Sequence, residues 1–137
     1  LSRGAYILNQ GGSSTPDAII LASGSEVHLA LEAAAQLEKV GISAAVVNVH
    51  TIKPLDKDTV LRFARRCGRV ITAEEHSIIG GLGGAIAEVL GEEAPTPMAR
   101  IGVRDTFGES GKPAELLEKY GLTTEALVQA AKKLMQP

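Results

Sequence analysis

The sequence is poor in aromatic and sulfur-containing side chains. It has no tryptophan and only two tyrosines and two phenylalanines, so it lacks the aromatic platforms on which many proteins stack single-stranded nucleic acid. Cys67 is the only cysteine. A single cysteine excludes an intrachain disulfide and a cluster of thiolate metal ligands, and it indicates a reducing, cytoplasmic setting.

Long apolar runs and a strong net charge are also missing. No stretch approaches the roughly 20 apolar residues of a membrane span, and the first residues lack the basic-then-apolar pattern of a signal peptide. A formal net charge of −2 gives no reason to expect nucleic acid or an anionic membrane as a partner. The composition predicts one globular domain over residues 1–137. Because the chain starts at Leu1 without a methionine, we expect a piece of a longer polypeptide.

Apolar segments of strand length alternate with segments of helical period. Helices are expected at 57–67, 82–90, 114–120 and 125–135, and another between residues 26 and 40; strands are expected at 5–8, 17–23, 43–49, 69–73 and 98–103. This order predicts an α/β fold with a three-layer open sheet, in which about five mostly parallel strands carry helices on both faces.

Several helix ends and helix faces can be predicted from single residues. Ser23 and Glu26 have the spacing of a capping box, Gly41 suits the end of the same helix, and Thr123 suits the start of the last one. Cys67 falls on an apolar stripe and is expected in the core. The stripe predicted for the first helix is Val27, Ala30, Leu31, Ala34 and Leu37.

The segment ITAEEHSIIGGLGGAIAEVL, residues 71–90, is the main candidate for a functional site. Its glycines do not form a G-x-G-x-x-G fingerprint, because Ile86 stands where the third glycine belongs. We expect Gly80, Gly81 and Gly83 to permit close approach of another backbone. The N–H groups of the helix that follows can instead hold an anion, either a phosphate or a neighbouring carboxylate.

The polar residues of this segment are Glu74, Glu75 and His76. They suit acid–base chemistry or metal binding, but three adjacent residues cannot all converge on one point, and no second acidic or histidine cluster has a matching spacing. We therefore expect an interface role for them. His28 is expected in solvent, and His50, at the end of the second long strand, can line the same edge.

The motifs together resemble a known family. VITAEEHSIIGGLGGAIAEVL and IILASGSEVHLALEAAAQLEKVGISAAVVNV are similar to the C-terminal domain shared by transketolase, deoxyxylulose-phosphate synthase and the β-subunits of 2-oxo-acid dehydrogenases. RGAYIL and VRDTFGESGKPAELLEKYGLTTEALVQAAKKL resemble transketolases, especially those encoded as two polypeptides. The EEHSIIGGLGG form is closer to the synthase and dehydrogenase branches, so these branches stay open as alternatives.

The resemblance implies a dimeric enzyme of the pentose phosphate pathway that uses thiamine diphosphate and Mg²⁺ to transfer two-carbon ketol units between sugar phosphates. It also implies that the catalytic, cofactor-binding and metal-binding residues belong to preceding pyrimidine- and diphosphate-binding domains or to a separate N-terminal subunit. None of those motifs matches a position in this chain, so we expect the chain alone to bind neither cofactor and to be inactive. In the dehydrogenase branch, the equivalent domain helps to dock a carrier-protein core.

Overall fold

The computed structural model describes residues 5–9, 15–22, 26–49, 57–77, 82–103 and 123–136. The strands are β1 (Ala5–Asn9), β2 (Ala18–Ala22), β3 (Ala44–Val49), β4 (Val70–Ser77) and β5 (Met98–Val103), and the helices are α1 (Val27–Lys39), α2 (Lys57–Cys67), α3 (Leu82–Glu93) and α5 (Thr124–Leu134). Within these ranges, no helix has both the length and the apolarity to cross a membrane. The helix expected at 114–120 lies outside the described residues.

The strands form one sheet in the order β1-β3-β2-β4-β5. Four of them are parallel, and β1 pairs antiparallel with β3 at one edge. β2 is buried along its whole length, which explains why its sequence is apolar at every position: helices cover both of its faces. The expected α/β class, with a mostly parallel open sheet, is confirmed.

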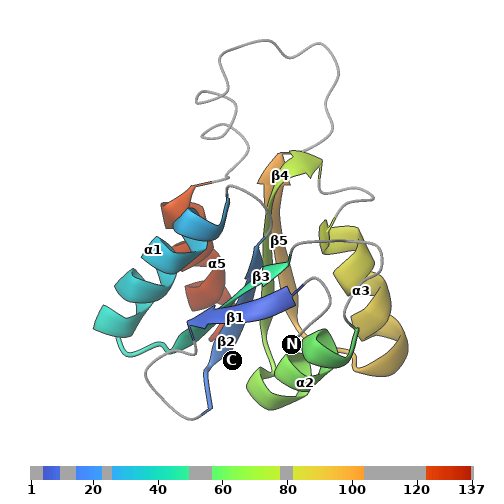
Figure 1. Ribbon diagram of the computed structural model, residues 1–137. Coiled ribbons are helices and arrows are strands. Elements are labelled where there is room, and N and C mark those ends of the chain that lie inside the picture. Colours follow the sequence, from blue (N-terminus) through green and yellow to red (C-terminus); the bar gives the residue numbers. More distant parts are fainter. Residues whose placement is uncertain are drawn as a thin grey trace.

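The helices form a layer on each face of the sheet (Figure 1). α1 and α5 pack on one face, where Leu37 and Leu127 are fully buried. α2 and α3 pack on the other face, where Phe63 and Ile86 are buried. Alternation along the strands supplies both cores, since neighbouring residues such as Ile19 and Ile20 of β2 belong to opposite faces.

The buried face of α1 differs from the sequence prediction. The helix begins at Val27, with Glu26 before it in a helical conformation. Ser23, the other residue of the predicted capping box, lies outside the described residues, so the capping box stays a prediction. Leu31 is 37% exposed, whereas Ala33 is fully buried. The buried face consists mainly of small residues, which let α1 lie close to the sheet and to α5. The predicted stripe was therefore wrong at Leu31.

The glycine at the end of α1 adopts a left-handed conformation, with φ of 83° at Gly41. Its N–H donates to the Glu38 carbonyl at 3.1 Å, and the Ile42 N–H donates to the Leu37 carbonyl at 2.9 Å. This pair of bonds is a Schellman motif, which satisfies the last helical carbonyls. The predicted helix end is confirmed.

Substitution at this position is expected to destabilise the chain. Gly41→Ala should lower the free energy of unfolding by about 1 kcal/mol, because a side chain disfavours positive φ. Gly91→Ala is the matched control on α3, where a Cβ meets no atom within 4 Å; there, alanine should raise stability by about 0.5–1 kcal/mol. Urea denaturation of both variants measures the difference, and effects of the same sign would contradict it.

Polar groups tie the elements together at the amino ends of the central strands. The Arg69 guanidinium donates from Nε to the Leu134 carbonyl at 3.1 Å and from Nη1 to the Asp17 carbonyl at 3.2 Å. The Asp17 carboxylate in turn accepts from the Ser43 N–H at 2.9 Å. These contacts fix the end of α5 to the amino edge of the sheet.

Candidate functional site at the carboxyl edge of the sheet

The carboxyl ends of β2, β3, β4 and β5 lie along one edge, because these strands are parallel. In open α/β sheets this is the edge where ligands and partners bind. The pairing of β2 with β4 extends to Ala22 and Ala73, while β4 continues to Ser77 beside β5. β4 therefore projects past β2, carrying the residues singled out in the sequence (Figure 1).

Glu74 is the last residue of β4 in regular register, paired with Gly102 of β5. Its side chain is 1% exposed. Strand alternation places it on the same face as Val70, which packs in the cluster with α2 and α3. A carboxylate buried this deeply must be compensated by polar partners. Glu74 is thus an internal group of the described domain, and its contribution to an interface stays a prediction.

The next residues lie where the ladder becomes irregular. The pairing of β4 with β5 shifts register between Glu74 and Ser77, the interval that contains Glu75 and His76. Such irregularities bend a strand and are common near functional sites. Gly83 lies in the first turn of α3, while Gly80 and Gly81 lie outside the described residues. Glu74, Glu75, His76 and Gly83 therefore belong to one strand–helix connection.

A second buried carboxylate at the same edge was not predicted as a site residue. Glu26 follows β2 at the start of α1 and is 3% exposed. The position of Glu26 shortly after a predicted strand was the signal that could have marked it as a site residue. Its capping-box spacing from Ser23 favoured a role in starting the helix instead. His28 is exposed on α1, as expected, and His50 lies outside the described residues.

The described residues do not offer a site for a divalent cation. Across these ranges, no group of three histidine, cysteine, aspartate or glutamate side chains is placed to hold a metal ion. A Mg²⁺ ion bound to a diphosphate needs carboxylate or carbonyl ligands beside the phosphates. The described part of the chain therefore does not fit that group, and the absence of a cofactor site from the whole chain stays a prediction.

Cys67, the last residue of α2, lies in the core cluster between the sheet, α2 and α3, as predicted. Its side chain is 7% exposed. Burial raises the pKa of its thiol; the charge of Arg66 opposes this rise and that of Asp17 adds to it. The reactive species is the thiolate, so burial and the raised pKa both slow its chemistry. The pKa of the Cys67 thiol is therefore higher in the folded than in the unfolded chain, which favours the protonated thiol in the fold. The contribution of this thiol to stability is fully present below the unfolded pKa and is lost as the pH rises through the folded pKa, because the unfolded chain loses its proton first.

We expect Cys67 to react with a thiol reagent at least about tenfold more slowly in the native chain than in urea at the same pH. The double variant Cys67→Ala, Arg65→Cys is the control, because Arg65 is exposed on the same helix. Its thiol should react at similar rates in both states. Similar rates for the native and denatured wild-type chain would show that α2 opens readily and does not protect Cys67.

The comparison with known proteins identifies the family. Residues 11–127 match the profile described as "Transketolase, C-terminal domain". The chain belongs to the transketolase C-terminal domain family. It is 51% identical over 132 residues to the 6-deoxy-6-sulfo-D-fructose transketolase subunit SqwH of Clostridium sp. (strain MSTE9), covering 96% of this chain and 40% of that protein. It is 43% identical to the 1-deoxy-D-xylulose-5-phosphate synthase of Heliobacterium modesticaldum, covering 93% of this chain and 19% of the synthase.

A solved structure extends this likeness to three dimensions. The structure entitled "Split gene transketolase, inactive beta4 tetramer" superposes with a TM-score of 0.87 at 49% identity, covering 96% of this chain and 42% of the solved chain. The chain therefore spans about two fifths or less of the relatives described here. The predicted transketolase C-terminal fold and family are confirmed.

Proposed function

We propose that this chain is the C-terminal part of a transketolase, which uses thiamine diphosphate and Mg²⁺ to transfer two-carbon ketol units between sugar phosphates. The observation that carries the proposal is the likeness to a split-gene transketolase over 96% of the chain. The SqwH relative, whose name specifies a sulfonated sugar, widens the range of substrates to be tested. The pentose phosphate pathway and the cytoplasm are the expected setting.

In this proposal the chain serves assembly and carries no catalytic residue. The thiamine diphosphate and Mg²⁺ would be held by preceding pyrimidine- and diphosphate-binding domains or by a separate N-terminal subunit, and a second copy would complete a homodimer. Glu75, His76, Gly80, Gly81 and Gly83 would form the contact surface. Glu74 would support that surface from inside the domain, because its side chain is buried there. Neither nucleic acid nor a membrane is an expected partner.

Deoxyxylulose-phosphate synthase is a second candidate. Several such synthases match almost the whole chain, with identities between 37% and 44%. The identity to the SqwH transketolase subunit is higher, at 51%, and favours transketolase. A 2-oxo-acid dehydrogenase β-subunit, in which this domain would be a subunit-interaction module, has no comparable support among these relatives.

An activity assay distinguishes the two candidates. The chain should be produced together with the polypeptide portion that carries the pyrimidine and diphosphate domains, and supplied with thiamine diphosphate and Mg²⁺. The proposal expects ketol transfer from a ketose phosphate to an aldose phosphate, with no 1-deoxy-D-xylulose 5-phosphate formed. Formation of 1-deoxy-D-xylulose 5-phosphate without ketol transfer would establish the synthase instead.

The 137-residue chain alone is expected to bind no cofactor. Calorimetric titration with thiamine diphosphate in the presence of Mg²⁺ should give no saturable heat, because the described residues offer no cluster of metal ligands. The reconstituted assembly is the positive control and should show saturable binding under the same conditions. Binding by the isolated chain with a Kd near about 1 μM, equivalent to about −8 kcal/mol, would contradict this expectation.

A further inference from the structure

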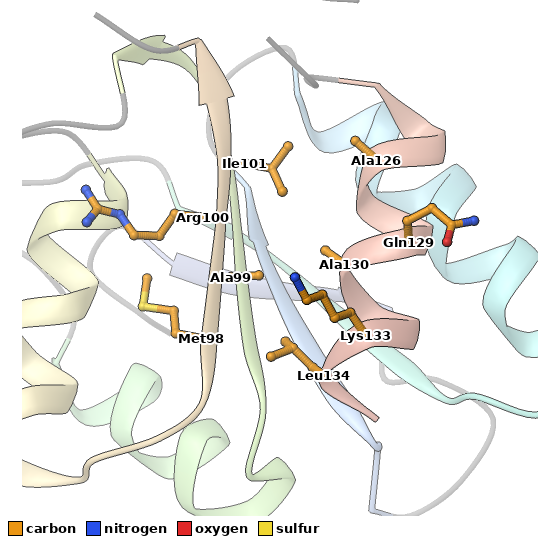
Figure 2. Close-up of a pocket in the computed structure, with 9 residues that line it drawn as sticks. All are labelled: Met98, Ala99, Arg100, Ile101, Ala126, Gln129, Ala130, Lys133 and Leu134. Carbon is orange, nitrogen blue, oxygen red and sulfur yellow. The ribbon is translucent and has the colours of Figure 1, made fainter. Parts of the chain in front are cut away.

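Arg100 of β5 reaches the first turn of α3. β5 is the outermost strand of the described sheet, and Arg100 is exposed there. Its side chain extends to the α3 side of the strand, opposite the side that faces α5 (Figure 2). A Cβ placed on Gly84, in the first turn of α3, would lie 3.7 Å from Nη2 of Arg100. The guanidinium therefore lies close to the backbone at the start of this helix.

A guanidinium in this place calls for a nearby carboxylate. The start of a helix carries a partial positive charge, because its first N–H groups have no partner within the helix. The first turn of α3 contains no acidic residue that would offset this charge, so Arg100 alone would be repelled by it. A carboxylate that lies between the two would be stabilised by both.

Glu74 lies on the face of the sheet where this carboxylate is needed. Thr72 pairs in register with Arg100, and Glu74 pairs with Gly102, so all four residues are on one face. One strand spacing and two residues of rise place the backbones of Glu74 and Arg100 about 8 Å apart, a separation that two long side chains can span. Glu74 is 1% exposed, and Glu74 and Arg100 each take part in a hydrogen-bonding or charge interaction.

Arg100 is also the cation that the neighbouring elements place near Glu74. On this face of β4 and β5, the residues in regular register are Val70, Thr72, Glu74, Met98, Arg100 and Gly102. α3, which covers these strands, contains no basic residue. Within the described part of these three elements, Arg100 is therefore the available counter-charge for the buried carboxylate, and a buried charge without one is costly.

We propose that Glu74 and Arg100 form a charge pair beneath the first turn of α3, and that this pair positions Gly83 for contact with a neighbouring domain or subunit. The pairing of β4 with β5 becomes irregular beyond Glu74, so the ladder does not fix the connection that follows. The charge pair supplies this constraint by joining β4, β5 and α3 at one point. The inference rests on the proposed function, because it takes the connection between β4 and α3 as the contact surface.

A double-mutant cycle in the assembled enzyme tests the pair. The chain is produced together with the portion that carries the pyrimidine and diphosphate domains, and assembly is measured by analytical ultracentrifugation. Glu74→Gln and Arg100→Met should each raise the dissociation constant of the assembly about tenfold, and the double variant should be no weaker than the weaker single variant. Arg100→Lys should lose less than Arg100→Met, because lysine keeps the charge but not the planar fork.

Two further readouts separate positioning from a general loss of stability. Turnover at saturating protein and thiamine diphosphate should stay within about twofold of wild type, because the pair acts on assembly and not on the reacting atoms. Glu93→Gln makes the same charge change at an exposed carboxylate at the end of α3. Its effect on assembly should be below about twofold and additive with that of Arg100→Met.

The pair can also be observed in the wild-type protein, which does not require any variant to fold. In NMR spectra of the full 137-residue chain, hydrogen exchange at the Arg100 guanidinium should be at least about tenfold slower than at Arg65. Arg65 is the reference because it is exposed on α2. Glu74→Gln should remove the difference, since it removes the charge that holds the guanidinium.

An additive cycle, an Arg100 guanidinium that exchanges as fast as that of Arg65, or equal weakening by Glu74→Gln and Glu93→Gln would each overturn the proposal. Failure of the proposed function has a different result: the wild-type assembly would form without ketol transfer, while slow exchange at Arg100 would remain. A fully active wild-type assembly with an additive cycle would reject the charge pair alone.

Discussion

Leu37→Ala is expected to lower the free energy of unfolding by about 3 kcal/mol, whereas Leu31→Ala should lower it by less than about 1 kcal/mol. Both leucines are on α1, but Leu37 is fully buried and Leu31 is 37% exposed. Leu37 packs in the core between the sheet, α1 and α5, so its removal leaves a cavity in addition to the loss of apolar burial. The same change at Leu31 removes mostly surface contact.

Urea denaturation of the full chain measures both effects in one series. The midpoint should fall strongly for Leu37→Ala and slightly for Leu31→Ala, with similar m-values if the unfolded chains expose similar surface. Helix propensity does not account for the difference, because both substitutions replace leucine by alanine within one helix. Equal losses of unfolding free energy at the two positions would contradict the burial that the structure gives them. They would support the stripe predicted from periodicity, in which both leucines face the core.

The sheet could be predicted well because burial on both faces leaves a strong sequence signal. β2 and β3 are apolar at successive positions, which amphipathic strands are not. Helix ends defined by local chemistry were also predictable: the Thr123 hydroxyl accepts from the Ala126 N–H at 3.1 Å, as its position before the last helix indicated. Such caps depend only on residues that are close in sequence.

The exact face of α1 could not be predicted, because periodicity does not show which neighbour covers a residue. Leu31 and Ala33 both lie near the border of the apolar stripe, and helical spacing from Val27 assigns Leu31 to it. In the structure, α5 packs on α1, and the Thr124 hydroxyl donates to Glu32 at 2.9 Å. Tertiary packing therefore decided which of the two residues is buried.

The candidate site shows the same division between local and tertiary information. The position of Glu74, Glu75 and His76 at a carboxyl edge followed from the strand pattern, but the burial of Glu74 did not. Burial of its carboxylate depends on β5 lying beside β4 and on helices covering that face. The pocket between β5 and α5, lined by Ala99, Ile101, Ala126 and Ala130, was not predictable either, because it requires α5 to lie beside the outermost strand of the described sheet.

Gly83→Val is expected to weaken assembly of the proposed whole enzyme by about 10- to 100-fold, or about 1.4–2.7 kcal/mol, while the free domain still folds. Gly83 lies in the first turn of α3 and belongs to the proposed contact surface. Among the described residues, only Gly41 and Gly68 have positive φ. Valine at position 83 therefore does not have to adopt a left-handed conformation. The helical backbone shared by positions 83 and 91 gives Gly83→Val and Gly91→Val the same propensity cost, that of a β-branched residue in a helix. The sequence gives Gly81→Val the same expectation.

The matched control is Gly91→Val, the same substitution on the same helix, at an exposed position where a Cβ meets no atom within 4 Å. If Gly83 permits close approach of a neighbouring backbone, then only Gly83→Val should prop the surfaces apart. Its assembly should dissociate at higher protein concentration in analytical ultracentrifugation, and its ketol-transfer rate should recover as protein concentration rises. Thermal unfolding of the two free variants should be similar, which separates assembly from folding. Unchanged association with a collapse of turnover at saturating thiamine diphosphate would mean that the connection between β4 and α3 acts directly on the chemistry.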